Sequence, residues 1–503
     1  MKNRIIRNVV ASLILEITSV ICAFILPRMI ISGFGSEYNG LVSSVTQFLS
    51  VVTLLRSGVG GVMRAALYRP LVEKDVYRIS SIINATEHFM RRIAYIFSAF
   101  LVVFAGVYPV LVSSEFGWFY TFTLVLILGI STIAQYYFGI TYQFLLSADQ
   151  RSYVYSMLQT AATIFNTLFS VLLINAGVEF RLMKLISALV FTAIPIALYW
   201  YVHGHYEILR NVPRDDNCIN QRWDAFVHQV AAFIHSNTDL MLLTVFTDLY
   251  QVSVYSIHNM VVTGVKKFVM VFTSGMESVI GKMIASGKRE ELVSFVDVYE
   301  WVISVISIIA FVCTAILIAP FMKVYTLSVT DADYIQPILG YLLVFASFLE
   351  CIRLPYKSMV ESAGHFKQTR NGAIMEASIN IGVSLLFIKP FGSVGVAFGT
   401  VMAMAFRTLQ YAIYSTKVIL KRTYRFVLKR VLITLINILL IMLPYMHSGM
   451  DAVLISYVSG YYSWIVVALV TFVVTSIVTM IVNTVAYGNI LTTVIYLIRY
   501  RKR

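Results

Sequence analysis

Apolar runs of about twenty residues, the length an α-helix needs to cross a bilayer, recur along almost the whole chain. Hydrophobic residues make up 59% of the 503 residues, and charged residues make up only 13%. An ordinary soluble protein has about 25% charged residues, and a water-soluble globule cannot bury this much apolar surface. The composition therefore predicts an all-α membrane protein.

A hydropathy window of about 19 residues identifies fourteen candidate transmembrane helices. They cover residues 9–32, 40–63, 93–113, 118–145, 154–176, 183–203, 225–247, 252–279, 299–322, 335–356, 374–388, 393–416, 431–447 and 461–487. Glycine and proline cluster at several of their ends, and Lys389-Pro390-Phe391-Gly392 predicts a turn between the eleventh and twelfth spans.

Lysine and arginine are unevenly distributed between alternate loops, which predicts the orientation of the chain. If the N-terminus is cytoplasmic, the inside segments carry 30 of the 39 basic residues and the outside loops carry 4. This count predicts that both termini are cytoplasmic, and it explains most of the net charge of +14 without a nucleic-acid partner. The longest loops, 64–92 and 204–224, are too short for a catalytic domain. We therefore expect no enzyme and assign the function to the membrane part.

A weak internal repeat divides the spans into two sets. Phe34-Gly-Ser-Glu-Tyr38 matches Phe246-Thr-Asp-Leu-Tyr250, and Ser170-Val-Leu-Leu-Ile174 matches Ser384-Leu-Leu-Phe-Ile388 at nearly the same offset. Low-complexity coincidence is the alternative explanation. The repeat predicts two parallel six-span units, as in transporters that alternate access at the repeat interface. The expected parts are an N-terminal bundle at 1–204, a cytoplasmic linker at 205–224, a C-terminal bundle at 225–420, and two further helices with a basic tail at 421–503.

Charged residues inside predicted spans are informative, because each costs about 2.5–3.5 kcal/mol at a helix centre. Eight of them are singled out as site candidates: Glu16, Arg28, Arg56, Asp239, Lys266, Lys267, Glu376 and Arg407. Because of this cost we expect them to face protein or a water-filled cavity rather than lipid. For Arg28 and Glu376, near span ends, local pairing or snorkelling is an equal alternative.

Helical spacing groups some of these charges with other polar residues. His228, His235 and Asp239 lie within about 40° on the seventh span, a stripe that can bind a cation or proton. The eighth span places Lys267 on one face with serine and threonine residues, and Lys266 on the adjoining ridge.

Two further spans carry polar stripes. Arg407 shares a stripe with Tyr411 on the twelfth span, and Arg56 borders a polar face on the second. Such stripes would line a hydrated, basic central cavity. Polar residues that hold helices together are the competing explanation, for the second span above all.

No cofactor or metal is predicted. Cys22, Cys218, Cys313 and Cys351 lack the spacing of a metal site. The segment from Gly275 to Met283 resembles a phosphate loop but has one residue too many, and it ends in Met where Ser or Thr would hold magnesium.

Four segments resemble the Wzx-type flippases of the polysaccharide transporter branch of the MOP superfamily. They are Asn8-Val-Val-Ala-Ser-Leu with Leu26-Pro27-Arg28, Phe34-Gly-Ser-Glu-Tyr-Asn-Gly40, Leu145-Leu-Ser-Ala-Asp-Gln150 and Asn237-Thr238-Asp239-Leu-Met-Leu242. The resemblance implies two six-helix bundles around a central cationic cavity, followed by two C-terminal helices. It also implies that the protein flips an undecaprenyl-pyrophosphate-linked oligosaccharide across the bacterial inner membrane for O-antigen or capsule, upstream of a polymerase.

We therefore predict a fourteen-helix flippase whose partners are the lipid-linked oligosaccharide, the bilayer and the polysaccharide polymerase. The residues predicted to hold the pyrophosphate and sugars are Arg28, Arg56, Lys266, Lys267, Arg407 and Tyr411. The residues predicted to couple an ion are His228, His235, Asp239 and Glu16. A multidrug or cation antiporter of the same superfamily is one alternative, although it would favour an acidic cavity. A membrane glycan polymerase or ligase is another, although it would favour a long outer loop.

Overall fold

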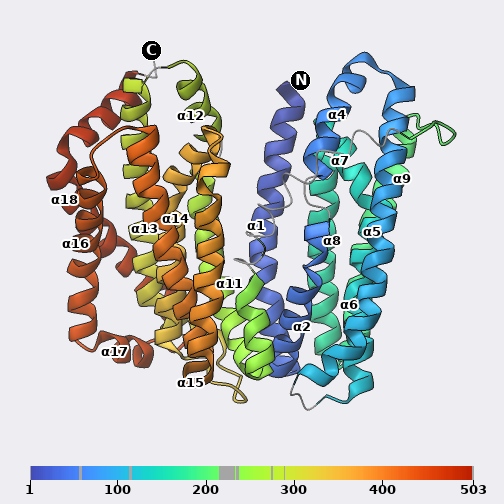
Figure 1. The fold of residues 1–503 in the computed structure, drawn as a ribbon. Helices are drawn as coiled ribbons and strands as arrows, with labels where there is room; N and C mark the ends of the chain where they lie inside the picture. The colour runs from blue at the N-terminus through green and yellow to red at the C-terminus, as the bar shows by residue number, and fades with distance from the viewer. Residues whose placement is uncertain are drawn as a thin grey trace. The chain divides into compact units, whose positions relative to one another are not determined.

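A computed structural model of the chain describes residues 2–55, 59–112, 116–214, 233, 237–273, 276–287 and 289–500 (Figure 1). Within these ranges every regular element is a helix, and no strand occurs. The contacts divide the chain into two compact units, Met1–Ser253 and Val254–Arg503. Unit 1 therefore includes the short helix 237–246, whereas the sequence placed it in the second bundle. The limits of the predicted bundles stay predictions.

The chain is an all-α, multi-pass membrane protein. The described residues contain ten helices that are long and apolar enough to span a membrane, or up to twelve if each of two bent helix pairs is one span. About half of the predicted seventh span, 225–247, lies outside the described residues. Fourteen spans and cytoplasmic termini therefore stay predictions.

Unit 1 is a bundle of long helices linked by short turns. Its elements are α1 (Lys2–Gly33), α2 (Ser36–Leu49), α3 (Val52–Leu55), α4 (Val59–Glu73), α5 (Val76–Leu111), α6 (Trp118–Ala134), the π-helix η1 (Gln135–Gly139), α7 (Ile140–Ala148), α8 (Ser152–Asn175), α9 (Phe180–His205) and the first turn of α11 (Leu249–Val271). Helix α1 packs along α8, α8 along α9, and α5 along α6.

Unit 2 has the same all-helical character. It contains the rest of α11, then α12 (Met276–Ala285), α13 (Arg289–Tyr325), α14 (Pro337–Ser362), α15 (Phe366–Tyr414), the π-helix η3 (Ser415–Ile419), α16 (Arg425–His447), α17 (Met450–Tyr457) and α18 (Tyr461–Tyr500). Helix α14 packs along α15, and α13 packs against both α14 and α18.

Helix α15 is a hairpin of two antiparallel arms that correspond to the predicted spans 374–388 and 393–416. Its backbone turns at Gly392, whose φ of +54° is a conformation that favours glycine. The amide nitrogen Nδ2 of Asn380 on the first arm donates to Oγ1 of Thr400 on the second, at 3.0 Å. The arms approach so closely that an ideal Cβ on Gly395 would overlap the backbone oxygen of Phe387. The turn predicted at 389–392 is therefore present in the structure.

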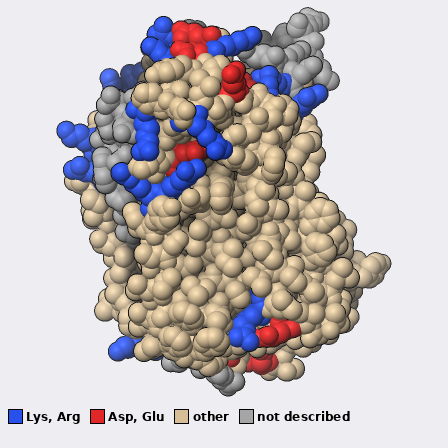
Figure 2. Space-filling model, turned by 90° about the vertical axis from the view of Figure 1, so that its right-hand side faces the viewer, with Lys and Arg blue, Asp and Glu red and all other residues tan. Residues whose placement is uncertain are grey.

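The surface has the distribution of charge that a bilayer requires. Figure 2 shows charged side chains at the upper and lower ends of one face and an uncharged band between them. On α5, Ile96 and Val103 are 58% and 66% exposed, so large apolar side chains face outward along the spanning part of this helix. Such a surface is stable against hydrocarbon and unstable against water.

Candidate functional site

Five charged side chains on three helices of unit 2 form a basic cluster, and the Glu376 carboxylate is at its centre. On one side, Nη1 of Arg353 on α14 donates to Glu376 Oε1 at 2.8 Å. On the other side, Nε of Arg407 on the second arm of α15 lies 3.2 Å from Glu376 Oε2. One turn before Arg353 on α14, Glu350 pairs with Lys266 of α11 through a 2.9 Å contact between Nζ and Oε2. The basic cluster therefore consists of Lys266, Glu350, Arg353, Glu376 and Arg407.

The Arg407 guanidinium is held by protein groups on several sides. Nη1 donates to the backbone oxygen of Thr369 at 3.0 Å and to Oε1 of Gln410 at 2.5 Å. Nη2 donates to the Tyr411 hydroxyl at 3.0 Å, and the guanidinium carbon lies 4.2 Å from the centre of the Tyr411 ring. Thr369 and Glu376 belong to the first arm and Arg407 to the second, so this arginine links the two arms of the hairpin.

The basic cluster contains three cations and two carboxylates, so one positive charge is in excess. Arg353, Glu376 and Arg407 are all buried, in a part of the chain where an uncompensated charge is costly. The buried Nε of Arg353 has no hydrogen-bond acceptor in the described part of the chain. Counted over the described residues, the basic cluster therefore carries one net positive charge inside unit 2.

The residues predicted to bind the cargo lie in different surroundings. Arg407 and Tyr411 are in direct contact, and Lys266 joins the same basic cluster through Glu350. Lys266 is half-buried, whereas Lys267 is exposed on the neighbouring face of α11. Arg28 is half-buried on α1. The structure thus brings together three of the six, and their role in holding cargo stays a prediction.

The predicted ion-coupling residues are only partly visible. Asp239 is half-buried on the helix 237–246, and Glu16 is exposed on α1. His228 and His235 lie outside the described residues, as does Arg56 of the cargo set. The proposed titratable stripe therefore stays a prediction.

Polar residues of α2, together with Ser50 directly after it, bond to the helix 237–246 within unit 1. The Ser50 hydroxyl donates to Oδ1 of Asn237 at 2.9 Å, and Gln47 donates to the same oxygen. The Thr244 hydroxyl donates to the Ser44 hydroxyl at 2.7 Å. Of the polar face predicted on the second span, Ser50 takes part in this packing, and the role of the rest of that face stays a prediction.

Sequence reasoning missed two charged members of the basic cluster and one of its hydrogen-bond partners. Arg353 and Glu350 lie inside the predicted span 335–356 but are not among the charges singled out from the sequence, and Gln410 is not among the predicted site residues. The available signal was the spacing of Glu350 and Arg353, because an acid and a base three residues apart share one face of an apolar helix.

Comparison with protein-family models and with curated protein sequences gives no match. Solved structures do match the fold. "Lipid II flippase MurJ, inward closed conformation" superposes with a TM-score of 0.71 at 13% identity, and the match covers 97% of this chain and all of that one.

Two transporter structures match over a smaller share. An inward-facing multidrug resistance MATE family transporter of the MOP superfamily gives a TM-score of 0.58 at 14% identity and covers 80% of this chain and 97% of its own. The MATE multidrug transporter DinF-BH gives 0.57 at 16% identity and covers 83% and 96%. At these identities the likeness shows the fold alone. The chain therefore has the fold that these flippase and MATE structures share.

Proposed function

We propose that this protein flips an undecaprenyl-pyrophosphate-linked oligosaccharide from the cytoplasmic to the outer leaflet of a bacterial inner membrane. The cargo would supply O-antigen or capsule synthesis and pass to a polysaccharide polymerase. Its pyrophosphate and sugars cannot cross hydrocarbon unaided, while its prenyl tail can stay in the membrane. The protein must therefore give the headgroup a polar path and leave the tail in apolar surroundings.

The observation that carries this proposal is the excess of buried cations in unit 2. Arg353 and Arg407 share the single carboxylate of Glu376. A third cation, Lys266 of α11, pairs with Glu350, which lies one turn before Arg353 on α14. A pyrophosphate is attracted by such an excess of positive charge, because opposite charges attract strongly where water is excluded. A multidrug or cation antiporter would instead be served by an excess of acid.

The C-terminal helices provide a second line of support. Residues 421–503, about a sixth of the chain, contain α16, α17 and α18. The share that the two MATE matches leave uncovered is of about this size, whereas the lipid II flippase match covers 97% of the chain. This difference favours a flippase for a lipid-linked headgroup over a drug antiporter.

An apolar pocket in unit 2 fits the tail of such a cargo. It has a volume of about 230 Å³ and is lined mainly by apolar side chains of α14, α15 and α16, including Phe345, Leu409 and Leu435. Its charged members, Glu300 and Arg430, bond to each other at 2.7 Å. A prenyl segment could occupy this pocket without leaving an unpaired charge against it.

The membrane potential would assist export of an anion. A cell interior that is electrically negative favours outward movement by about 2.3 kcal/mol per charge per 100 mV. Coupling to an ion through Asp239 would add to this driving force without being required by it.

The test is complementation of a bacterium that lacks its own O-antigen flippase, with polymerised surface glycan and membrane abundance measured together. The wild-type chain should restore glycan, and a combined Arg56→Ala, Lys267→Ala, Arg407→Ala variant should leave the lipid-linked unit on the cytoplasmic leaflet. Lys389→Ala is the matched control, because Lys389 is basic but exposed at the hairpin turn. Normal glycan from the combined variant would refute an anionic-headgroup mechanism.

A further inference from the structure

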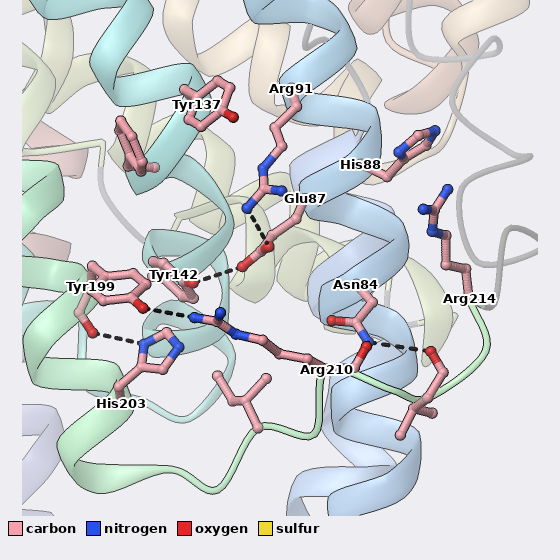
Figure 3. Close-up of a pocket in the computed structure, with 13 residues that line it drawn as sticks. Asn84, Glu87, His88, Arg91, Tyr137, Tyr142, Tyr199, His203, Arg210 and Arg214 are labelled. Atoms are coloured by element: carbon pink, nitrogen blue, oxygen red, sulfur yellow. Dashed lines mark hydrogen bonds and ion pairs between the residues drawn. The ribbon is translucent and has the colours of Figure 1, made fainter.

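Unit 1 contains a pocket of about 490 Å³ beside residues 84–91 of α5 (Figure 3). Its walls come from α5, the π-helix η1, α7, α9 and the segment 206–214 that follows α9. The lining combines arginine, histidine and tyrosine side chains with a single carboxylate, that of Glu87. The basic cluster of unit 2 contributes nothing to it.

Hydrogen bonds to α5 fix the segment 206–214 in place. The backbone N–H of Leu209 donates to Ser80 Oγ at 2.9 Å, and Ser81 Oγ donates to the backbone oxygen of Pro213 at 2.6 Å. The side-chain amide of Asn84 donates to the backbone oxygen of Leu209 at 3.1 Å. This segment is therefore ordered before any ligand binds, which lowers the entropy cost of binding.

The start of the same segment is anchored to the end of α7. The Tyr206 hydroxyl donates to Oδ2 of Asp149 at 2.6 Å. Burial, followed by the neighbouring Asp149 carboxylate, raises the pKa of Tyr206, so the hydroxyl stays protonated and keeps donating. Arg210 and Arg214 are thus carried by a segment that is held at both ends.

The pocket has two arginines more than its carboxylate can neutralise. Glu87 is already engaged, because Arg91 Nη2 lies 3.1 Å from its Oε2 and the Tyr142 hydroxyl donates to its Oε1 at 2.6 Å. Arg210 Nη2 donates to the Tyr199 hydroxyl at 2.8 Å, and it pairs with no carboxylate in the described ranges.

The second of these cations is Arg214, which makes no bond with any residue that the structure describes. Figure 3 shows Arg210 extending toward Tyr199 and His203, whereas Arg214 lies beside α5 on the side where His88 projects. Within the described ranges, two guanidinium groups of the pocket therefore pair with no carboxylate and can meet an external anion.

The pocket also borders the apolar surface of the unit. Tyr95, one turn after Arg91 on α5, is 62% exposed. Trp200, which follows Tyr199 on α9, is 71% exposed. Figure 2 shows blue side chains around a red one in the upper part of the face, directly above the uncharged band. Aromatic and basic residues at such a boundary are typical of the zone of lipid headgroups.

We propose that this pocket binds the phosphate of an anionic membrane lipid in the leaflet that the charge distribution predicts to be cytoplasmic. The planar forks of Arg210 and Arg214 match phosphate oxygens, and the lipid chains continue along the exposed apolar faces of α5 and α9. The site shares no residue with the basic cluster of unit 2. It is tested by binding alone, so that failure of the proposed function would leave it standing.

The experiment titrates dioleoylphosphatidylglycerol into the purified full-length chain in detergent and counts bound lipid by native mass spectrometry. The pocket variant is Arg210→Gln with Arg214→Gln. The matched control is Arg64→Gln with Arg92→Gln, because these arginines are exposed, lie on α4 and α5 and do not line the pocket. We expect the pocket variant to bind phosphatidylglycerol about tenfold more weakly, the effect of about 1.4 kcal/mol, and the control to stay within about twofold of the wild type.

Two further ligands identify the source of the phosphate. Dioleoylphosphatidylcholine should bind the wild type weakly, because its headgroup carries no net charge. Inorganic pyrophosphate should bind more weakly than phosphatidylglycerol, because it lacks the apolar chains. Pyrophosphate binding that equals that of the lipid, and that is lost in the pocket variant, would assign the pocket to a soluble anion and overturn the proposal.

Equal losses in the pocket variant and the control would also overturn it, because they would show attraction to surface charge in general. If the double variant does not fold, Arg214→Gln alone decides, since its removal leaves no described partner unpaired. Arg210→Lys should recover only part of the affinity, because lysine keeps the charge and loses the fork. Full binding by Arg214→Gln together with Arg210→Lys would contradict the proposed contacts.

Discussion

Nε of Arg407 lies 3.2 Å from the carboxylate of Glu376, a residue 31 positions earlier in the sequence. This contact joins the two arms of the α15 hairpin. The other oxygen of the same carboxylate accepts a hydrogen bond from Arg353 of α14. One acidic side chain thus links α14 to both arms of α15. The central part of unit 2 depends on it for both packing and charge balance.

Glu376→Gln should strongly destabilise unit 2. The substitution leaves Arg353 and Arg407 buried without their shared counter-charge, a change that typically costs about 3–5 kcal/mol. Thermal unfolding of the purified protein in detergent measures the effect. Glu179→Gln is the control, because Glu179 pairs with Arg181 at the surface. Equal unfolding temperatures for the two variants would show that Glu376 is dispensable for packing.

Arg407→Lys should impair transport more than Lys266→Arg. Lysine cannot reach Thr369, Gln410, Tyr411 and Glu376 together, whereas an arginine at 266 can still pair with Glu350. We expect a loss of at least about tenfold for Arg407→Lys, equivalent to about 1.4 kcal/mol. Surface glycan normalised to membrane abundance provides the measurement. The reverse order of activities would contradict the roles assigned here.

Gly395→Ala should disturb the hairpin, whereas Gly382→Ala on the first arm should not. A methyl group on Gly395 would meet the backbone oxygen of Phe387, which has no flexible side chain to move away, at an expected cost of about 1–3 kcal/mol. A methyl group on Gly382 would meet no atom within 4 Å. Unfolding temperatures of the two variants compare them directly, and equal values would mean that the arms are not closely packed.

The sequence predicts a residue's surroundings well where one placement is energetically costly, as for a charged side chain facing lipid. Glu376 and Arg407 stood inside apolar runs, and both are buried against protein, as the cost of a charge in lipid requires. The turn at Gly392 followed from a proline and a glycine between two spans. These features depend on residues close in sequence or on the bilayer itself.

The hydrogen-bond and ion-pair partners of these side chains could not be predicted, because they depend on how helices distant in sequence pack together. The helical stripe favours Lys267, which shares a face with serine and threonine, yet Lys266 is the lysine that pairs with Glu350 of α14. The pocket of unit 1 was missed for a similar reason. Residues 64–92 were treated as a loop, whereas α5 begins at Val76 and places Glu87 and Arg91 on a helix.

Asp239→Asn should lower transport several-fold without reducing the amount of protein in the membrane, because it removes charge and keeps size and hydrogen bonding. The measurement is transport at different pH values and sodium concentrations. His228→Gln and His235→Gln should change the same dependence. Wild-type pH and sodium profiles in all three variants would assign the stripe to packing alone.

The most direct test of the central claim is transport by the purified chain in proteoliposomes. The cargo is an undecaprenyl-pyrophosphate-linked oligosaccharide with a fluorescent label on the sugar, and a quencher outside the vesicles reports how much label has changed leaflet. A cationic dye is followed in parallel. The account predicts that the chain moves the labelled lipid, that Arg407→Ala abolishes this movement, and that the dye is not moved. Transport of the dye with no change in the leaflet distribution of the labelled lipid would contradict it.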